Sequence, residues 1–183
     1  MSEQKLDAIV RHTLLRRARA AIAATIGADI ESTPATASPP SFRAGAFVTL
    51  RVGGDLRGCI GYPESDRLLV DVVEHCAISA AVSDPRFPAV RASEWPRIDV
   101  EISVLGPIEV VRGIEDVEVG RHGLIAERGG RRGLLLPQVA VEWKWDREEF
   151  ASHTCVKAGL PRDAWRNGAT LFKFEAEVFG ENP

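Results

Sequence analysis

Several kinds of residue and motif are scarce in this sequence of 183 residues, and each scarcity excludes a class of protein. The three cysteines, Cys59, Cys76 and Cys155, cannot all pair, and their spacing is not that of a disulfide framework. We therefore expect a reducing, cytoplasmic compartment. No apolar run approaches the roughly 20 residues that span a bilayer, and the first residues lack the apolar core of a signal peptide. We expect no membrane segment.

Basic residues are not in excess. Twenty-three Lys and Arg against 26 Asp and Glu give a formal net charge of −3. That balance gives no electrostatic footprint for nucleic acid, although a local basic patch would still allow such binding. The arginines of the first 20 residues resemble a nucleic-acid run, but we interpret them as the solvated face of a helix.

The sequence also lacks the motifs of several common chemistries. It has no phosphate-binding Gly-x-x-x-x-Gly-Lys-Ser/Thr loop and no Rossmann glycine fingerprint after a strand. Cys-x-x-Cys, His-Glu-x-x-His and Gly-x-Ser-x-Gly are absent as well. Nucleotide, zinc and α/β-hydrolase chemistry are therefore not indicated, and we expect neither a metal nor a cofactor.

Apolar spacing in the first part of the chain predicts a helix over 3–26, with Ser2 as its cap and Gly27 at its end. Residues 29–41 contain three prolines and predict an irregular connection. Further on, strict alternation over Ile98 to Val104 predicts a strand, and a final strand is expected over 170–179.

Two β-hairpins are predicted, about 75 positions apart. Each has a strand, a Gly-Gly turn, an Arg-Gly pair and an apolar return strand, and each precedes a helix. We expect those helices from Ser65 or Asp66 to about Asp84, and from Asp146 to Ala158. This pattern indicates a weak internal duplication and an α+β fold with a mainly antiparallel sheet.

The stretch Leu56-Arg57-Gly58-Cys59-Ile60-Gly61 is the main candidate site. In an extended strand, Leu56 and Ile60 would point into a core while Arg57 and Cys59 share the other face. A guanidinium beside a thiol favours its ionisation, and Gly58 and Gly61 would let another molecule approach the backbone. The alternative is a packed strand cysteine, with both glycines required by a β-bulge.

An aspartate, Asp84, is expected at the C-terminus of the helix after the first hairpin, where a negative charge opposes the helix dipole. Arg86 is the nearest residue that could hold it there. The two side chains form either a structural clamp or a polar pair at the rim of a pocket.

An ordered set of motifs closely resembles the AMMECR domain family and covers the chain from about residue 6 to 181. After the strand 45–50 and Leu56 to Gly61, the matching segments are Asp84-Pro85-Arg86-Phe87, Val100 to Leu105, Gly120-Arg121-His122-Gly123-Leu124, Leu134 to Gln138, and Lys157 to Pro161.

The resemblance implies a compact α+β protein, a single domain over 1–183 with two interleaved, similar hairpin-plus-helix halves in 45–183. Prokaryotic members are called AmmeMemoRadiSam system protein A. Their companions are a Memo-type, dioxygenase-like protein and a radical S-adenosylmethionine enzyme. The resemblance does not establish a reaction; the substrate would be a small molecule or a modified macromolecule.

Two hypotheses follow for the candidate site. In an enzyme, Cys59 would be a nucleophile or redox thiol, Arg57 would stabilise its thiolate and His122 would be the general base. Glu101 and Gln138 would add polar contacts. In a binding or adaptor protein, Arg57 and Arg86 would hold an anionic group beside Gly58 and Gly61, and Cys59 would be structural.

Overall fold

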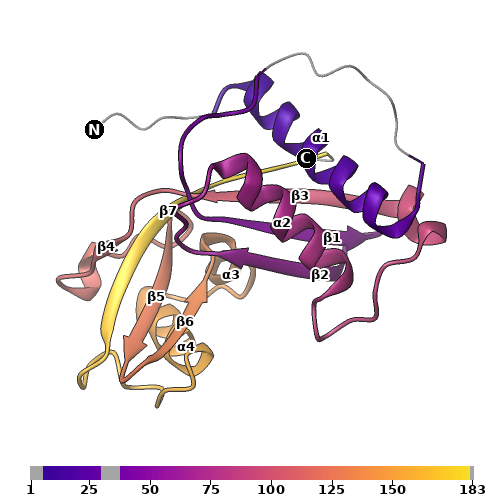
Figure 1. Cartoon of the computed structure of the whole chain (residues 1–183). Helices are drawn as coiled ribbons and strands as arrows, with labels where there is room; N and C mark the ends of the chain where they lie inside the picture. Colours follow the sequence, from indigo (N-terminus) through magenta and orange to yellow (C-terminus); the bar gives the residue numbers. More distant parts are fainter. Residues whose placement is uncertain (1–5, 30–37, 182–183) are drawn as a thin grey trace. The chain divides into compact units, whose positions relative to one another are not determined.

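Two units make up the chain in the computed structural model, which describes residues 6–29 and 38–181 (Figure 1). The first unit holds the described residues up to Leu105 and those from Glu177, and the second holds Gly106–Ala176. The strands pair antiparallel throughout, and helices accompany them in both units. This confirms the predicted α+β class, whereas the single-domain expectation stays a prediction.

The first unit is a sheet covered on one face by two helices (Figure 1). Its strands β1 (Ala46–Val52), β2 (Asp55–Tyr62) and β3 (Ile98–Leu105) lie in the order β2-β1-β3. The helices are α1 (Ala8–Ile26) and α2 (Leu69–Val82), and a 3₁₀ helix, Ala92–Arg97, precedes β3. The core between sheet and helices includes Leu14, Ile22, Val48, Leu50, Val73 and Ile102.

The second unit contains the second hairpin. Its strands are β4 (Glu109–Val110), β5 (His122–Arg128), β6 (Arg131–Leu135) and the first part of β7 (Thr170–Gly180). β5 pairs with both β6 and β7, and β4 pairs with β7. A 3₁₀ turn spans Ile114–Asp116, and the helices are α3 (Pro137–Glu142) and α4 (Arg147–Lys157). Phe150 and Cys155 of α4 pack with Leu124 and Ala126 of β5.

The structure corrects two helix predictions. α1 begins at Ala8, because the Asp7 carboxylate accepts a hydrogen bond from the Val10 N–H at 2.7 Å; the expected cap, Ser2, lies outside the described residues. Most of the segment 29–41 also lies outside them. α2 begins at Leu69 without a side-chain cap, since Ser65 instead accepts from the Arg67 N–H.

The structure also contains a helix of six residues, α3, that was not predicted from the sequence. By contrast, the capping box of α4 is confirmed. The Asp146 carboxylate accepts hydrogen bonds from the N–H groups of Glu148 and Glu149, and the Glu149 carboxylate accepts one from the Asp146 N–H.

Candidate functional site

A β-bulge lies in the return strand of the first hairpin. Leu50 pairs with Gly58 but the next residue, Arg51, pairs with Leu56, so Arg57 has no partner on β1. An extra residue reverses the alternation of side chains on one side of the bulge. Ile60 packs against the core as predicted. Leu56 was predicted to do the same, and that prediction is wrong, because its side chain is 38% exposed.

The two glycines of this strand are both in close contact with their own chain. A Cβ on Gly58 would overlap the carbonyl oxygen of Ala80 in α2, and a Cβ on Gly61 would overlap the ring of Phe47 in β1. Glycine is therefore required where α2 crosses β2. The space beside Gly58 and Gly61, predicted to admit a ligand, is filled at these positions by α2 and Phe47.

Asp84 and Arg86 bind the outer edge of β2 at Cys59. β2 is an edge strand, so backbone groups on its outer side need other partners. The Cys59 N–H donates to Asp84 Oδ2 at 2.9 Å, and Arg86 Nη2 donates to the Cys59 carbonyl at 3.3 Å. The structure thus places both residues beside Cys59.

The Asp84–Arg86 pair is itself tightly bonded. Arg86 Nε lies 3.0 Å from Oδ1, and Nη2 lies 2.7 Å from Oδ2. These bonds from Arg86, with the backbone N–H groups of Cys59 and Arg86, hold the pKa of the Asp84 carboxyl well below its usual range. Asp84 is buried, at 4% exposure, and these bonds outweigh the cost of burial and keep its carboxylate ionised inside the protein. This geometry is that of a structural clamp.

Arg57 is bound to the segment that leads to β3. Its guanidinium donates to both oxygens of Glu94, at 3.0 and 3.2 Å, and to the Pro88 carbonyl at 2.8 Å. The bond from Arg57 is the largest cause of a lowered pKa for Glu94. Only 14% of the Arg57 side chain is exposed. Its charge is therefore already neutralised by a protein carboxylate.

The thiol of Cys59 belongs to a row of polar side chains across three strands. Thr49 pairs with Cys59 on one side and with Glu101 on the other, and residues directly opposite each other share a face. The Thr49 hydroxyl donates to Cys59 Sγ at 3.3 Å. Val48 and Leu50 alternate with Thr49 and enter the core under the helices, so this row lies on the sheet's other face. The structure thus brings Cys59 and Glu101 onto one surface.

His122 and Gln138 belong to the second unit. His122 Nδ1 accepts a hydrogen bond from the Glu118 N–H at 3.0 Å, which leaves the proton of a neutral ring on Nε2. Burial lowers the pKa of this histidine. Gln138, in α3, has a buried Oε1 without a hydrogen-bond partner among the described residues. That His122 and Gln138 share one site with Cys59 stays a prediction.

Comparisons with known proteins identify the family of this chain. The AMMECR1 family model matches residues 15–179. Protein MK0488 of Methanopyrus kandleri is 49% identical over 180 residues, which cover 92% of this chain and 86% of that protein. A protein of Methanothermobacter thermautotrophicus is 52% identical over 148 residues, 76% of this chain and 77% of its own. The chain belongs to the AMMECR1 family.

A solved structure supports the same assignment. The crystal structure of the uncharacterized protein PH0010 from Pyrococcus horikoshii matches with a TM-score of 0.87 and 42% identity. The match covers 97% of this chain and 93% of that one. The AMMECR1 fold is thus confirmed over nearly the whole chain.

Two further observations concern the part of this AMMECR1 protein that the structure describes. No helix in 6–29 or 38–181 is both long and apolar enough to cross a membrane. No three His, Cys, Asp or Glu side chains of the same residues are grouped so that they could hold a metal ion.

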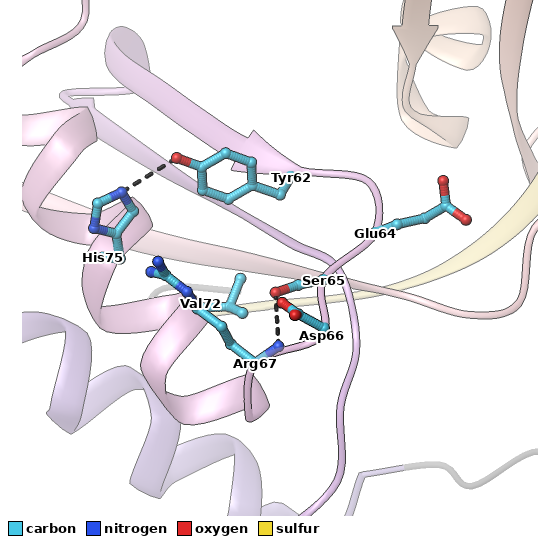
Figure 2. Close-up of a pocket in the computed structure, with 7 residues that line it drawn as sticks. All are labelled: Tyr62, Glu64, Ser65, Asp66, Arg67, Val72 and His75. Carbon is cyan, nitrogen blue, oxygen red and sulfur yellow. Dashed lines mark hydrogen bonds between the residues drawn. The ribbon is translucent and has the colours of Figure 1, made fainter.

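A pocket that the sequence reasoning missed lies at the end of β2, away from the clamp. Figure 2 shows its lining side chains, from the loop after Tyr62 and from the start of α2. No sequence motif marks His75 as a functional residue, because a single histidine beside an apolar stripe carries no pattern. Tyr62, the one tyrosine of the chain, likewise belongs to no motif of the sequence.

Proposed function

We propose that this AMMECR1 protein is a binding component of an AmmeMemoRadiSam system, and that it recognises an anionic group at the Cys59 edge of its first unit. The observation that carries this proposal is the pairing of the charges around Cys59. Arg57 is bound to Glu94, and Asp84 is bound to Arg86 and to the Cys59 backbone. These bonds favour a fixed recognition surface over a reacting centre.

Arg86 is the residue that would contact the anionic group. Half of its side chain is exposed, and Nη1 has no hydrogen-bond partner among the described residues. Asp84 holds the rest of the guanidinium in place, so little side-chain freedom would be lost on binding. A planar guanidinium held in this way suits a carboxylate or a phosphate.

The companions implied by the family, a Memo-type protein and a radical S-adenosylmethionine enzyme, are the partners to test. We expect both to be retained by the tagged wild-type protein and by Cys59→Ser, because no bond is made to the thiol. Loss of both companions in Cys59→Ser, with the variant still folded, would argue against a structural thiol.

A matched pair of variants tells whether binding depends on the positive charge of Arg86 or on the bonds between Asp84 and Arg86. Asp84→Asn and Arg86→Gln both weaken the clamp, but only Arg86→Gln removes the positive charge. If Arg86 holds an anionic group, Arg86→Gln will lose capture of the ligand-bearing companion while Asp84→Asn retains most of it. Equal losses in the two variants would show that rigidity, and not the charge, is what binding requires.

A second candidate function is catalysis by Cys59, with His122 as the base. The hydrogen bond from Thr49 to Cys59 Sγ favours it, since this bond orients the sulfur on the polar face of the sheet. Full turnover by Cys59→Ser in a reconstituted three-protein reaction would exclude nucleophilic chemistry. Alkylation of Cys59 at pH 7 that is no faster than that of an unstructured peptide thiol would exclude a thiol activated for attack.

A further inference from the structure

A pocket lies at the end of β2 in the first unit, and neither Cys59 nor the Asp84 and Arg86 side chains that bind it line this pocket. It has a volume of about 510 Å³, which is the size of a small-molecule pocket. It is lined by Tyr62, Glu64, Ser65, Asp66, Arg67, Val72 and His75. Figure 2 shows these side chains around one hollow, with Val72 as its apolar part.

One wall of this pocket is aromatic and fixed. The rings of Tyr62 and His75 lie 5.9 Å apart at an interplanar angle of 25°, and the Tyr62 hydroxyl is hydrogen-bonded to His75 Nε2 at 3.2 Å. The two residues come from β2 and from α2, so both are carried on regular secondary structure. A wall of this kind needs no rearrangement before a ligand is bound.

Arg67 supplies a positive charge beside that wall. Its guanidinium lies next to His75 in Figure 2 and has no hydrogen bond or ion pair with any described residue. Arg57, Arg86 and Arg121 are instead bound to carboxylates. The backbone at Arg67 is held by Ser65, whose Oγ accepts from its N–H at 3.1 Å and still has a hydroxyl hydrogen to donate.

Away from the Arg67 guanidinium, the pocket offers a hydrogen-bond acceptor, the Asp66 carboxylate. The Asp66 carboxylate lies beside Ser65 and forms no ion pair with Arg67 (Figure 2). A ligand that satisfies both parts carries an oxyanion for Arg67 and hydroxyl or amine donors for Asp66. A cavity of this size with a few convergent polar groups is the usual form of a small-molecule site.

We propose that this pocket binds a small polyhydroxylated anion, a sugar phosphate or a sugar acid, with its anionic group on Arg67 and its hydroxyls on Asp66. Tyr62 and His75 form the wall against which the ligand lies. This proposal does not depend on the role of Cys59.

The test is a titration followed by amide chemical shifts, with ribose 5-phosphate, gluconate and ribose as probes. We expect at least one of the two anions to shift the amides of Ser65, Arg67 and His75, and to bind about tenfold or more tightly than ribose. Preference between the two anions tells a phosphate ligand from a carboxylate one. No shift of these amides by either anion would overturn the proposal, as would equal binding of ribose.

Two arginine variants complete the test. Arg67→Gln should weaken binding of the preferred anion by about tenfold or more, because a charge-assisted hydrogen bond is lost. Arg97→Gln removes an exposed arginine elsewhere in the same unit and should leave binding unchanged. Well-dispersed spectra of both variants report that they are folded. An Arg67→Gln protein that binds as the wild type does would overturn the assignment of the anion to Arg67.

Discussion

The two hairpins of this protein share one construction and differ at one strand edge. Both turn on two glycines with positive φ, Gly53 and Gly54 in the first and Gly129 and Gly130 in the second. In the return strands, Gly58 and Gly133 stand 75 positions apart. A Cβ on Gly58 would overlap the backbone of α2, and a Cβ on Gly133 would overlap the backbone at the C-terminal end of α4. The repeated features are those that seat a helix on a hairpin.

The differences are confined to the first hairpin and gather around Cys59. β6 pairs with β5 without a register shift, whereas β2 has the bulge at Arg57. The position equivalent to Cys59 is Leu134, an apolar residue. The clamp from Asp84 and the Arg57–Glu94 ion pair both serve β2. We infer that the shared features build the fold and that the features peculiar to β2 build the site.

The largest expected effects are at the two shared glycines. Gly58→Ala and Gly133→Ala should each lower the free energy of unfolding by about 2 kcal/mol or more, because a methyl group would be forced against helix backbone. Urea unfolding of each variant measures the change. Gly106→Ala is the matched control, since its Cβ would lie 3.4 Å from the Glu175 carbonyl oxygen, in ordinary contact. If Gly133→Ala left stability unchanged while Gly58→Ala lowered it, the two glycines would not be equivalent positions of the two hairpins.

The second largest effect on stability is expected from loss of the clamp between Asp84 and Arg86. Asp84→Asn replaces a buried carboxylate that binds Arg86 and the Cys59 N–H, and we expect it to cost about 2 kcal/mol. The second hairpin has no corresponding carboxylate at Leu134 among the described residues. Chemical unfolding checks this value, and a cost below about 0.5 kcal/mol would show that the clamp adds nothing to stability.

The same carboxylate predicts a pH dependence. Because the pKa of Asp84 is lowered by folding, its contribution is fully present above the unfolded value of about 3.9. That contribution is lost as the pH falls from there towards the lowered pKa of the folded state. The difference in unfolding free energy between wild type and Asp84→Asn should therefore shrink below about pH 4. A difference that grows on acidification would contradict this assignment.

A smaller effect is expected for Arg57→Lys. Lysine keeps the charge but cannot bind both oxygens of Glu94, so we expect a loss of about 1 kcal/mol. Arg97→Lys, at an exposed position of the same 3₁₀ helix as Glu94, is the control and should be silent in the same thermal melts. Equal melting temperatures for the two variants would mean that the two-point contact is unimportant.

The smallest effect should be that of Cys59→Ser, compared with Cys155→Ser. Cys59 is partly exposed, with Thr49 beside its thiol, so less than about 0.5 kcal/mol should be lost. Cys155 is fully buried in α4, and a hydroxyl there should cost about 1–2 kcal/mol. Calorimetry of the two variants measures both losses of stability. A larger loss for Cys59→Ser than for Cys155→Ser would mean that Cys59 is packed in the core.

Local signals made much of the fold predictable. The Gly-Gly turns, the alternation over β3 and the capping box at Asp146 each depend on residues a few positions apart, and each prediction was confirmed. The six-residue α3 was too short for its apolar spacing to be seen.

The site was less predictable, because its contacts join distant positions. Arg57 binds Glu94, 37 positions away, and Asp84 binds the Cys59 backbone across 25 positions. The bulge reversed the expected direction of Leu56, and a one-residue slip of this kind leaves no mark on a strand pattern. Of the clamp, only the Asp84–Arg86 pair was close enough in the sequence to be anticipated.

The most direct test of the central claim is amide hydrogen exchange at Cys59. Asp84 takes the place of a neighbouring strand at the edge of β2, whereas the N–H of Ile60 faces β1. In Asp84→Asn, exchange at Cys59 should accelerate by about tenfold or more while exchange at Ile60 changes much less. If the Cys59 amide exchanges no faster in Asp84→Asn than in the wild type, Asp84 does not hold this edge, and the distinction between the two hairpins fails.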